Sequence, residues 1–329
     1  MNEKLKICTI GGGTGTSVVA AALREIDHIQ LKAIVSVSDN GGSTGRLRDE
    51  FGFLPVGDLR QAVAALAVSK EGDWIRKLLL YRFEKGSGLE GHNLGNLILT
   101  SLQDMTGSTS GAMEVASSVF RLKGSVLPIT NDNTQIETKY EDGSTLVGEN
   151  NLDENRSGKR IEGIRLIPSS SIYIKSKEAI EEADYIVIGP GDLYASVSAS
   201  LVVPGTREAF EVTKAKIIYV MSLMTKYSQT NGFSASDHLK VIEKEIGRKV
   251  DFILVNNEKI PDDILSMYKK DGDLPVIDDL GSDERVLRAK LIKPVKVVQS
   301  KKDTVVRSYL RHDADKLREV FREICHKEN

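Results

Sequence analysis

Glycine and threonine residues follow the first apolar segment of the chain in a pattern that suits phosphate binding. Residues 5–10 predict a short buried strand, and residues 17–24 predict a helix. A loop between a strand and a helix presents backbone N–H groups and the positive end of the helix to a phosphate, and glycine keeps a Cβ out of the way. The candidate diphosphate ligands are Gly11, Gly12, Gly13, Thr14, Gly15 and Thr16.

A second polar loop follows the next predicted strand, residues 31–37, and contains Ser38, Asp39, Asn40 and Arg46. The carboxyl ends of neighbouring parallel strands form one crevice, where open α/β sheets bind ligands. Asp39 is a candidate to hold a ribose or Mg²⁺ through its oxygens, and Arg46 is a candidate partner for phosphate. Turn formation is the structural alternative for Asp39, and a solvated surface position is the alternative for Arg46.

Two later strand ends extend this crevice. Residues 217–221 predict a strand that leads to Lys226, and residues 184–188 predict a buried strand that ends in Gly189, Pro190, Gly191, Asp192 and Tyr194. Asp192 could bind a ribose or a metal ion, or cap a helix, and Lys226 could pair with phosphate. Three aromatic residues could stack on a base, although packing is the more ordinary role of each: Tyr194, Phe233 and Tyr268.

The first loop fits neither of two common nucleotide-binding patterns. It contains no lysine, which excludes a P-loop. Gly11 and Gly13 occupy the first two positions of the dinucleotide fingerprint, but Thr16 stands at the third, and no acidic residue stands at the tip of the second strand in the usual spacing. NAD-type binding therefore stays an alternative, as does a tight turn with no ligand.

His92 and Asn93 precede a helix that is predicted to run to about residue 105. Their side chains and the first N–H groups of that helix could face an anion, or they could serve only as a turn and a cap. No Ser–His–Asp order and no cysteine at a loop nucleophile position stands out. The sequence therefore supports nucleotide binding better than any catalytic step.

The alternation of strands and helices predicts an α/β fold with a doubly wound, mostly parallel sheet. Residues 134–140 and 145–148 flank a turn and predict a hairpin, which with a strand at 161–167 makes a small antiparallel insertion at about residues 131–167. Residues 149–160 predict a loop. We expect a single α/β domain over residues 1–329, with 251–255 as the last clear parallel strand and short edge strands at 293–298 and 304–306.

Two helices are predicted between the second loop and His92. Asp58 is expected to cap a helix over residues 59–68. In a second helix, over residues 73–83, the side chains expected to face the core are Trp74, Leu78 and Leu79.

The composition is that of an ordinary soluble globular protein, with 40% hydrophobic and 28% charged residues. A net charge of -2 and the lack of a basic block give no electrostatic footprint for nucleic acid. The two cysteines lack metal or CxxC spacing, which predicts buried thiols in a reducing compartment. No segment predicts a signal peptide or a membrane span, so we expect a cytoplasmic protein without membrane insertion.

Several motifs resemble those of the CofD/YvcK family, in its gluconeogenesis-factor branch. They span most of the chain in the family's order, at residues 11–15, 38–48, 55–60, 91–96 and 188–194. The resemblance implies a Rossmann-like core with a smaller appended α/β part. It also adds Asn96 to the candidate nucleotide ligands.

The family contains 2-phospholactate transferase, which moves phospholactate from a nucleotide-activated donor onto a deazaflavin alcohol with Mg²⁺. Its acceptor site has a pair of aspartates after the second strand, whereas this chain has Asp39 followed by Asn40. If the chain is a transferase, Asp39 is the catalytic and metal-binding candidate.

The gluconeogenesis-factor branch is associated with normal cell shape and cell-wall growth on gluconeogenic carbon sources. Its members resemble sensors of nucleotide sugars such as UDP-N-acetylglucosamine. The resemblance therefore implies a regulatory protein that binds a UDP-sugar, with GDP or NAD as alternative ligands and Mg²⁺ as a candidate cofactor. Protein partners in envelope synthesis are expected, with a homodimer as the default assembly.

Overall fold

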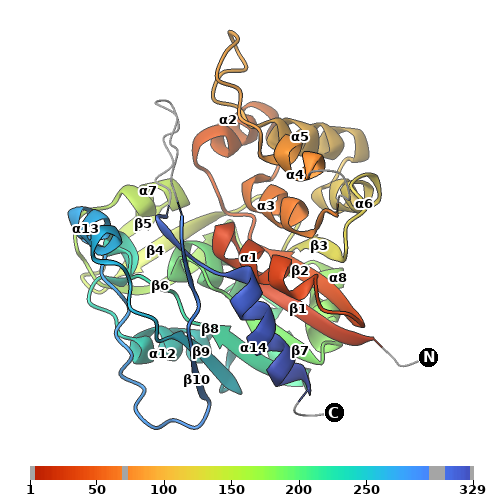
Figure 1. Cartoon of the computed structure of the whole chain (residues 1–329). Helices are drawn as coiled ribbons and strands as arrows, with labels where there is room; N and C mark the ends of the chain where they lie inside the picture. The colour runs from red at the N-terminus through yellow and green to blue at the C-terminus, as the bar shows by residue number, and fades with distance from the viewer. Residues whose placement is uncertain (1–3, 69–72, 296–307, 327–329) are drawn as a thin grey trace.

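The computed structural model describes residues 4–68, 73–295 and 308–326. Its centre is a seven-stranded sheet with the strand order β10-β9-β8-β7-β1-β2-β3, and every neighbouring pair is parallel. Helices flank this sheet (Figure 1). The strands are β1 Leu5–Gly11, β2 Ile29–Val35, β3 Ser125–Pro128, β7 Tyr185–Ile188, β8 Lys216–Val220, β9 Phe252–Asn256 and β10 Val286–Ala289.

The direction of strand addition reverses at β1. The chain first adds β2 and β3 on one side of β1, and later adds β7, β8, β9 and β10 on the other side. Ile10 accordingly pairs with Ile34 on β2 and with Ile188 on β7. A ligand crevice is expected outside the carboxyl ends of the strands at such a reversal point.

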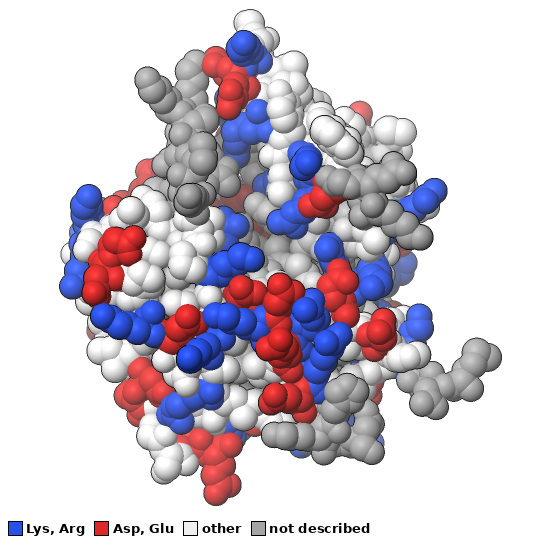
Figure 2. Space-filling view, in the orientation of Figure 1, with Lys and Arg blue, Asp and Glu red and all other residues white. Residues whose placement is uncertain are grey.

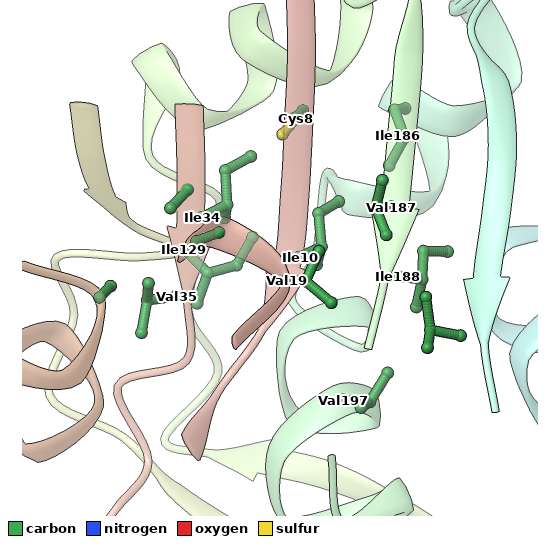
Figure 3. Close-up of a cluster of buried hydrophobic side chains, with 14 of the residues drawn as sticks. Cys8, Ile10, Val19, Ile34, Val35, Ile129, Ile186, Val187, Ile188 and Val197 are labelled. Carbon is green, nitrogen blue, oxygen red and sulfur yellow. The ribbon is translucent and has the colours of Figure 1, made fainter. Parts of the chain in front are cut away.

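The core is built on the three central strands. All four residues of β7 are buried, which is typical of a parallel strand covered on both faces. Figure 3 shows aliphatic side chains of β1, β2 and β7, such as Ile10, Ile34 and Val187, packed together with Cys8. Burial raises the pKa of the Cys8 thiol to about 12. Both cysteines are buried, as predicted, and no disulfide joins them.

The helices form groups along this sheet. Five of them lie together over the β2–β3 side: α2 Gly42–Phe51, α3 Gly57–Leu66, α4 Trp74–Leu80, α5 Leu94–Thr106 and α6 Thr109–Val119 (Figure 1). Helix α1, Gly13–Leu23, packs against the last helix, α14, Ala314–His326. The other helices are α7 Glu149–Glu154, α8 Ile174–Glu181, η1 Leu193–Ser198 (a π-helix), α9 Ala199–Leu201, α10 Thr206–Val212, α11 Tyr227–Thr230, α12 Ala235–Ile246 and α13 Asp262–Asp271.

The antiparallel insertion is present as predicted. It is a three-stranded sheet of order β5-β4-β6, made of β4 Gln135–Tyr140, β5 Thr145–Val147 and β6 Ile161–Ile167. The prediction of a loop over residues 149–160 was wrong for residues 149–154, which form helix α7, and is confirmed for residues 155–160. Gly148, with φ of 98°, turns the chain, and Leu152 is fully buried, so a helical turn packs under the hairpin.

Three further expectations are corrected. Residues 251–255 do not hold the last parallel strand, because β10 pairs with β9 at the sheet edge. Val56, not Asp58, is the N-cap residue of α3. In α4 only Leu79 is buried, whereas Trp74 is 65% and Leu78 49% exposed, because this short helix packs one face on α3 and α5.

The C-terminal segment adds an antiparallel pair, β11 Ile292–Pro294 with β12 Leu310–His312. The edge strand expected at 304–306, and the end of the one expected at 293–298, lie outside the described residues. Among the helices that the structure describes, none is long and apolar enough to cross a membrane.

Candidate functional site

Four strand ends lie side by side at the carboxyl edge of the sheet. The loops after β2 and β1 are joined by a hydrogen bond from Ser36 N–H to the Gly11 carbonyl, at 3.0 Å. The Thr16 hydroxyl donates to the Pro190 carbonyl at 3.2 Å, which joins the loops after β1 and β7. The Ser222 hydroxyl donates to the Gly191 carbonyl at 2.8 Å and brings in the loop after β8. The loops predicted to form one crevice are therefore neighbours.

Glycines in the first loop allow neighbouring side chains and backbone to approach it closely. A Cβ on Gly12 would lie 2.2 Å from Oδ2 of Asp58, and a Cβ on Gly15 would lie 2.5 Å from the Pro190 carbonyl oxygen. The backbone N–H of Gly13 donates to the Asp58 carboxylate. The first turn of α1 thus carries an N–H group already paired with an acidic side chain, and any diphosphate at this turn would lie beside that carboxylate.

Asp39 and Asp58 place two carboxyl groups beside the first loop. Asp39 accepts hydrogen bonds from the Gly41 N–H, at 2.9 Å, and from the Thr44 hydroxyl. Burial raises the pKa of Asp39 against the effect of these hydrogen bonds. Burial and then the charge of Asp39 raise the pKa of Asp58 to about 7. The pair therefore carries less than its full negative charge near neutral pH.

Helix α7 brings two more acidic groups to the site. Asp153 lies 2.6 Å from the Lys226 ammonium, which also contacts Asp192 at 2.5 Å. Burial by itself lowers the pKa of Lys226, but the two carboxylates outweigh burial and raise it, so the lysine stays charged. Burial and the charge of Asp39 raise the pKa of Glu149 well above its usual range. Lys226 thus ties the insertion to the loop after β7.

Gln229 connects the same segments through an amide. Its Nε2 donates to Asp153 at 2.8 Å, and its Oε1 accepts from the backbone N–H groups of Tyr194, at 3.2 Å, and Ala195, at 3.1 Å. These two N–H groups belong to the first turn of η1, so Gln229 fixes where that turn lies relative to α7. Asn40 makes a similar link, because its Oδ1 accepts from the Asn150 N–H at 2.7 Å.

A polar chain extends from Asp39 toward α5. Asn93 caps α5 by accepting from the Asn96 N–H at 3.1 Å. The Asn96 side chain donates to Thr44 and to Ser43, each at 3.3 Å, and accepts from Nε of Arg60 at 2.7 Å. His92 contacts Ser43 through Nδ1 at 3.3 Å. The predicted group of His92, Asn93 and Asn96 is therefore continuous with the Asp39 loop.

The predicted aromatic residues are engaged in packing. Tyr194 is 3% exposed, and its ring packs edge-to-face on Phe233 with centroids 6.5 Å apart. The Tyr268 hydroxyl accepts from the Leu310 N–H at 3.1 Å, and its ring packs on Tyr309. Tyr268 belongs to a second hydrophobic cluster with Ile260 and Leu310. Base stacking by these rings stays a prediction.

A cavity of about 280 Å³ lies at the carboxyl ends of β8 and β9. Ser222, which lines it, is also the residue that contacts the loop after β7. The cavity therefore adjoins the row of strand ends rather than covering the first loop. Its lining is mostly apolar: Met221, Leu223, Val255, Ile260, Leu265, Pro275 and Val276, with Ser222, Asn256, Glu258 and Lys259.

Charges on the surface do not define a second site. On the face shown in Figure 2, basic and acidic side chains are interspersed, and no patch of one sign dominates. In residues 4–68, 73–295 and 308–326, no group of three or more His, Cys, Asp or Glu side chains is arranged to hold a metal ion.

The candidate site includes residues that the sequence did not mark as ligands. Asp58 was expected only to cap a helix, and Glu149 and Asp153 were placed in a loop. The spacing of Glu149 and Asp153, four residues apart after a glycine, is a helix-start signal that could have put both on one helical face. No local pattern marks Gln229.

A family model described as 2-phospho-L-lactate transferase CofD matches residues 7–298. The chain belongs to the CofD family.

Curated CofD-family relatives match the chain over nearly its full length. A putative gluconeogenesis factor of Thermotoga maritima is 39% identical over 321 residues, which cover 97% of this chain and 99% of the relative. The gluconeogenesis factor of Bacillus subtilis is 37% identical and covers 96% of this chain and 97% of its own length. A crystal structure of a Bacillus halodurans protein superposes with a TM-score of 0.87 at 36% identity and covers 97% of this chain and 99% of that one.

Proposed function

We propose that this CofD-family protein is a cytoplasmic regulatory protein that binds a nucleotide sugar, most simply a UDP-sugar. The observation that carries the proposal is the convergence of the glycine loop, the start of α1 and an apolar cavity along one row of strand ends. Binding without turnover is the activity that such a set of groups supports best.

In this proposal, the diphosphate, base and sugar of the ligand would lie along the row of strand ends. The diphosphate would lie on the N–H groups of the first loop, with the Thr14 hydroxyl available because no hydrogen bond to it is present among the described residues. The base would enter the cavity after β8 and β9, whose apolar lining and volume of about 280 Å³ suit a flat ring. The sugar would then lie toward the loop after β2 and helix α7.

The acidic groups of the site suit a ligand that brings a divalent cation. Mg²⁺ is commonly held by one or two carboxylates together with phosphate oxygens and water, and Asp39 and Asp58 supply two carboxylates beside the first loop. When bound, Mg²⁺ would neutralise charge on the diphosphate. Lys226 stays committed to Asp153 and Asp192 and would act on phosphate only if one of these pairs opens.

The names of the relatives suggest the cellular setting. Since the Thermotoga maritima and Bacillus subtilis relatives are named gluconeogenesis factors, we propose a role in metabolic control for this chain. Coupling to cell shape and cell-wall growth, through protein partners in envelope synthesis, follows from the family resemblance. A homodimer is the default assembly.

Calorimetric titration with UDP-N-acetylglucosamine, GDP and NAD, each with and without Mg²⁺, tests the proposal. We expect micromolar binding of the UDP-sugar, with the ligand recovered intact. Preference for NAD, or no binding of any of the three, would refute UDP-sugar binding. Preference for GDP that depends on Mg²⁺ would favour the transferase described next.

A Mg²⁺-dependent transferase with a nucleoside-diphosphate donor is the second candidate. The observation that favours it is the Asp39–Asp58 pair, because a carboxyl group with a pKa near 7 can act as a general base. Turnover of such a donor that is lost in Asp39→Ala would support it. Clean binding without turnover would count against it.

A further inference from the structure

Three basic side chains meet around Gly91, at the end of the site away from the cavity. A Cβ on Gly91 would lie 3.1 Å from Nη2 of Arg46, and Nη1 of Arg82 donates to the Gly91 carbonyl at 2.7 Å. His92 follows directly and is 9% exposed. Burial, Arg46 and Arg82 lower the pKa of His92, and Glu50 acts in the opposite direction. The histidine is therefore neutral at neutral pH, while two guanidinium groups lie beside it.

Hydrogen bonds to Ser43 fix the tautomer of this histidine. The Ser43 oxygen accepts from the Asn93 N–H at 3.2 Å and from the Asn96 amide at 3.3 Å, which uses both of its lone pairs. Its own O–H is left to donate to Nδ1 of His92, at 3.3 Å. The ring proton then resides on Nε2, which is a donor without a partner among the described residues.

Arg46 is also available for a ligand. It lies on the exposed side of α2 and makes no hydrogen bond or ion pair within the part of the chain that the structure describes. The neighbouring Arg48, by contrast, is buried and donates through Nη2 to Asn133 at 2.7 Å and to Thr134 at 2.9 Å. Arg46 is thus a cation with no carboxylate partner among the described residues, and it lies beside an imidazole N–H that also has no partner there.

This basic group is part of the crevice rather than a separate surface. His92 contacts Ser43, Ser43 shares the Asn96 amide with Thr44, and Thr44 donates to Asp39. The path thus runs from the carboxylate beside the first loop to the basic group through side chains in contact. A ligand with its diphosphate on the first loop and its base toward β8 would direct its other end here.

We propose that Arg46 and His92 form a subsite for an acidic substituent on the glycosyl part of the nucleotide sugar. A carboxylate would accept from the Arg46 guanidinium and from Nε2–H of His92, with Arg82 adding positive charge. This inference rests on the proposed function and adds a preference, among the nucleotide sugars that bind, for those that carry an acidic sugar.

UDP-glucose and UDP-glucuronic acid form a matched pair of probes, because they differ only in a hydroxymethyl group against a carboxylate. We expect calorimetry to give at least tenfold tighter binding of the acidic sugar. Arg46→Gln should reduce that preference to less than about threefold, because it weakens binding of UDP-glucuronic acid more than binding of UDP-glucose. Arg322→Gln, an exposed arginine on α14, is the control and should keep the full preference.

A second measurement tests the subsite without a nucleotide. The imidazole ¹⁵N shifts of His92, assigned with a His92→Gln variant, should report a proton on Nε2, and free glucuronate should move them in the wild type but not in Arg46→Gln. Binding of both UDP-sugars with equal affinity, unchanged in Arg46→Gln, overturns the subsite and leaves the proposed function standing. Binding of neither UDP-sugar overturns the proposed function. Free glucuronate then tests the subsite alone: the absence of a ¹⁵N shift in the wild type, or a shift that persists in Arg46→Gln, would count against the subsite.

Discussion

At the scale of single residues, Asp58 shows how a local pattern can mislead about role. An aspartate directly before a predicted helix looks like a cap, yet Val56 occupies the N-cap position and the Asp58 side chain reaches back to Gly13. The absence of a Cβ on Gly12 makes room for that carboxylate. The glycine loop is therefore shaped to admit the Asp58 carboxylate.

Asp58→Asn should make the protein more stable at pH 8. The pKa of Asp58 is raised to about 7 in the folded state, so the folded protein holds this proton more tightly than the unfolded chain does. Stability is then lost as pH rises from about 4 to about 7, and the asparagine removes that loss. Urea unfolding at pH 8 should show a gain of about 4 kcal/mol, and at pH 4 none. The same gain at both pH values would contradict the assignment, and exposed Asp104→Asn is the control.

Thr14→Val tests the first loop directly. The Thr14 side chain is half-buried at the start of α1, so valine should be accommodated without loss of fold. Loss of a hydroxyl that bonds phosphate should weaken UDP-sugar binding by about 1–3 kcal/mol. Unchanged affinity in calorimetry, with an unchanged circular dichroism spectrum, would remove Thr14 from the ligand set.

At the scale of elements, the site depends on how closely the loops after β1 and β7 approach. Gly15 lies inside α1, where alanine normally stabilises a helix by about 0.5–1 kcal/mol. A Cβ there would lie 2.5 Å from the Pro190 carbonyl oxygen. Because the Cβ and this oxygen are both attached to backbone, α1 or the loop after β7 would have to move to relieve the overlap.

We therefore expect Gly15→Ala to destabilise the fold by about 1–3 kcal/mol in urea unfolding. Gly163→Ala is the matched control, because nothing lies within 4 Å of its Cβ position. If both variants unfold at the same urea concentration as the wild type, the two loops are not in the contact described.

Lys226→Met should release helix α7 from the sheet. Without the ammonium, Asp153 and Asp192 would face each other unpaired, and the cost should be about 2–4 kcal/mol. Hydrogen exchange of residues 149–154 should rise more than exchange of β7. Lys240→Met, which removes a pair whose lysine is 73% exposed, should cost less than about 1 kcal/mol. Equal costs for the two variants would argue against a structural role for the Lys226 pairs.

The strands and glycine loops were predictable because their signals are local. An apolar run that ends in glycine, as at Ile10 and Gly11, or a turn between alternating segments, as at Gly143, needs only nearby residues to be recognised. Asp153 meets Lys226 and Gln229 only because the insertion folds back over the sheet, and no spacing within either segment encodes that contact. β10 was missed because a short edge strand with a charged residue carries little periodicity.

At the scale of the whole molecule, the loss of folding stability in acid should depend on the antiparallel pair β11–β12. His312 is buried on β12, hydrogen-bonds the backbone of Met221 and has no partner for Nε2. Burial lowers its pKa to about 4. The unfolded chain takes up this proton first, so stability should be lost as pH falls from about 6.5 to about 4.

The loss should approach about 3 kcal/mol between pH 7 and pH 4 in urea unfolding. In His312→Asn, whose amide can keep the bond to Met221, the difference between the two pH values should shrink by that amount. If the difference in stability between pH 7 and pH 4 is unchanged in the variant, other titrating groups cause the loss of stability in acid.

The sheet order has a consequence for synthesis on the ribosome. β1 is made before its partner β7, which emerges only after helices α2 to α6 and the insertion. α14, which packs on α1, emerges later still. Until residue 188 is available, one edge of the central strand remains open and must be shielded by nascent chain or chaperone. The glycine loop, residues 11–16, is translated well before the loop after β7, yet its contact with that loop forms only when the later segment has folded against it. Nucleotide binding would therefore distinguish a finished molecule from a growing one.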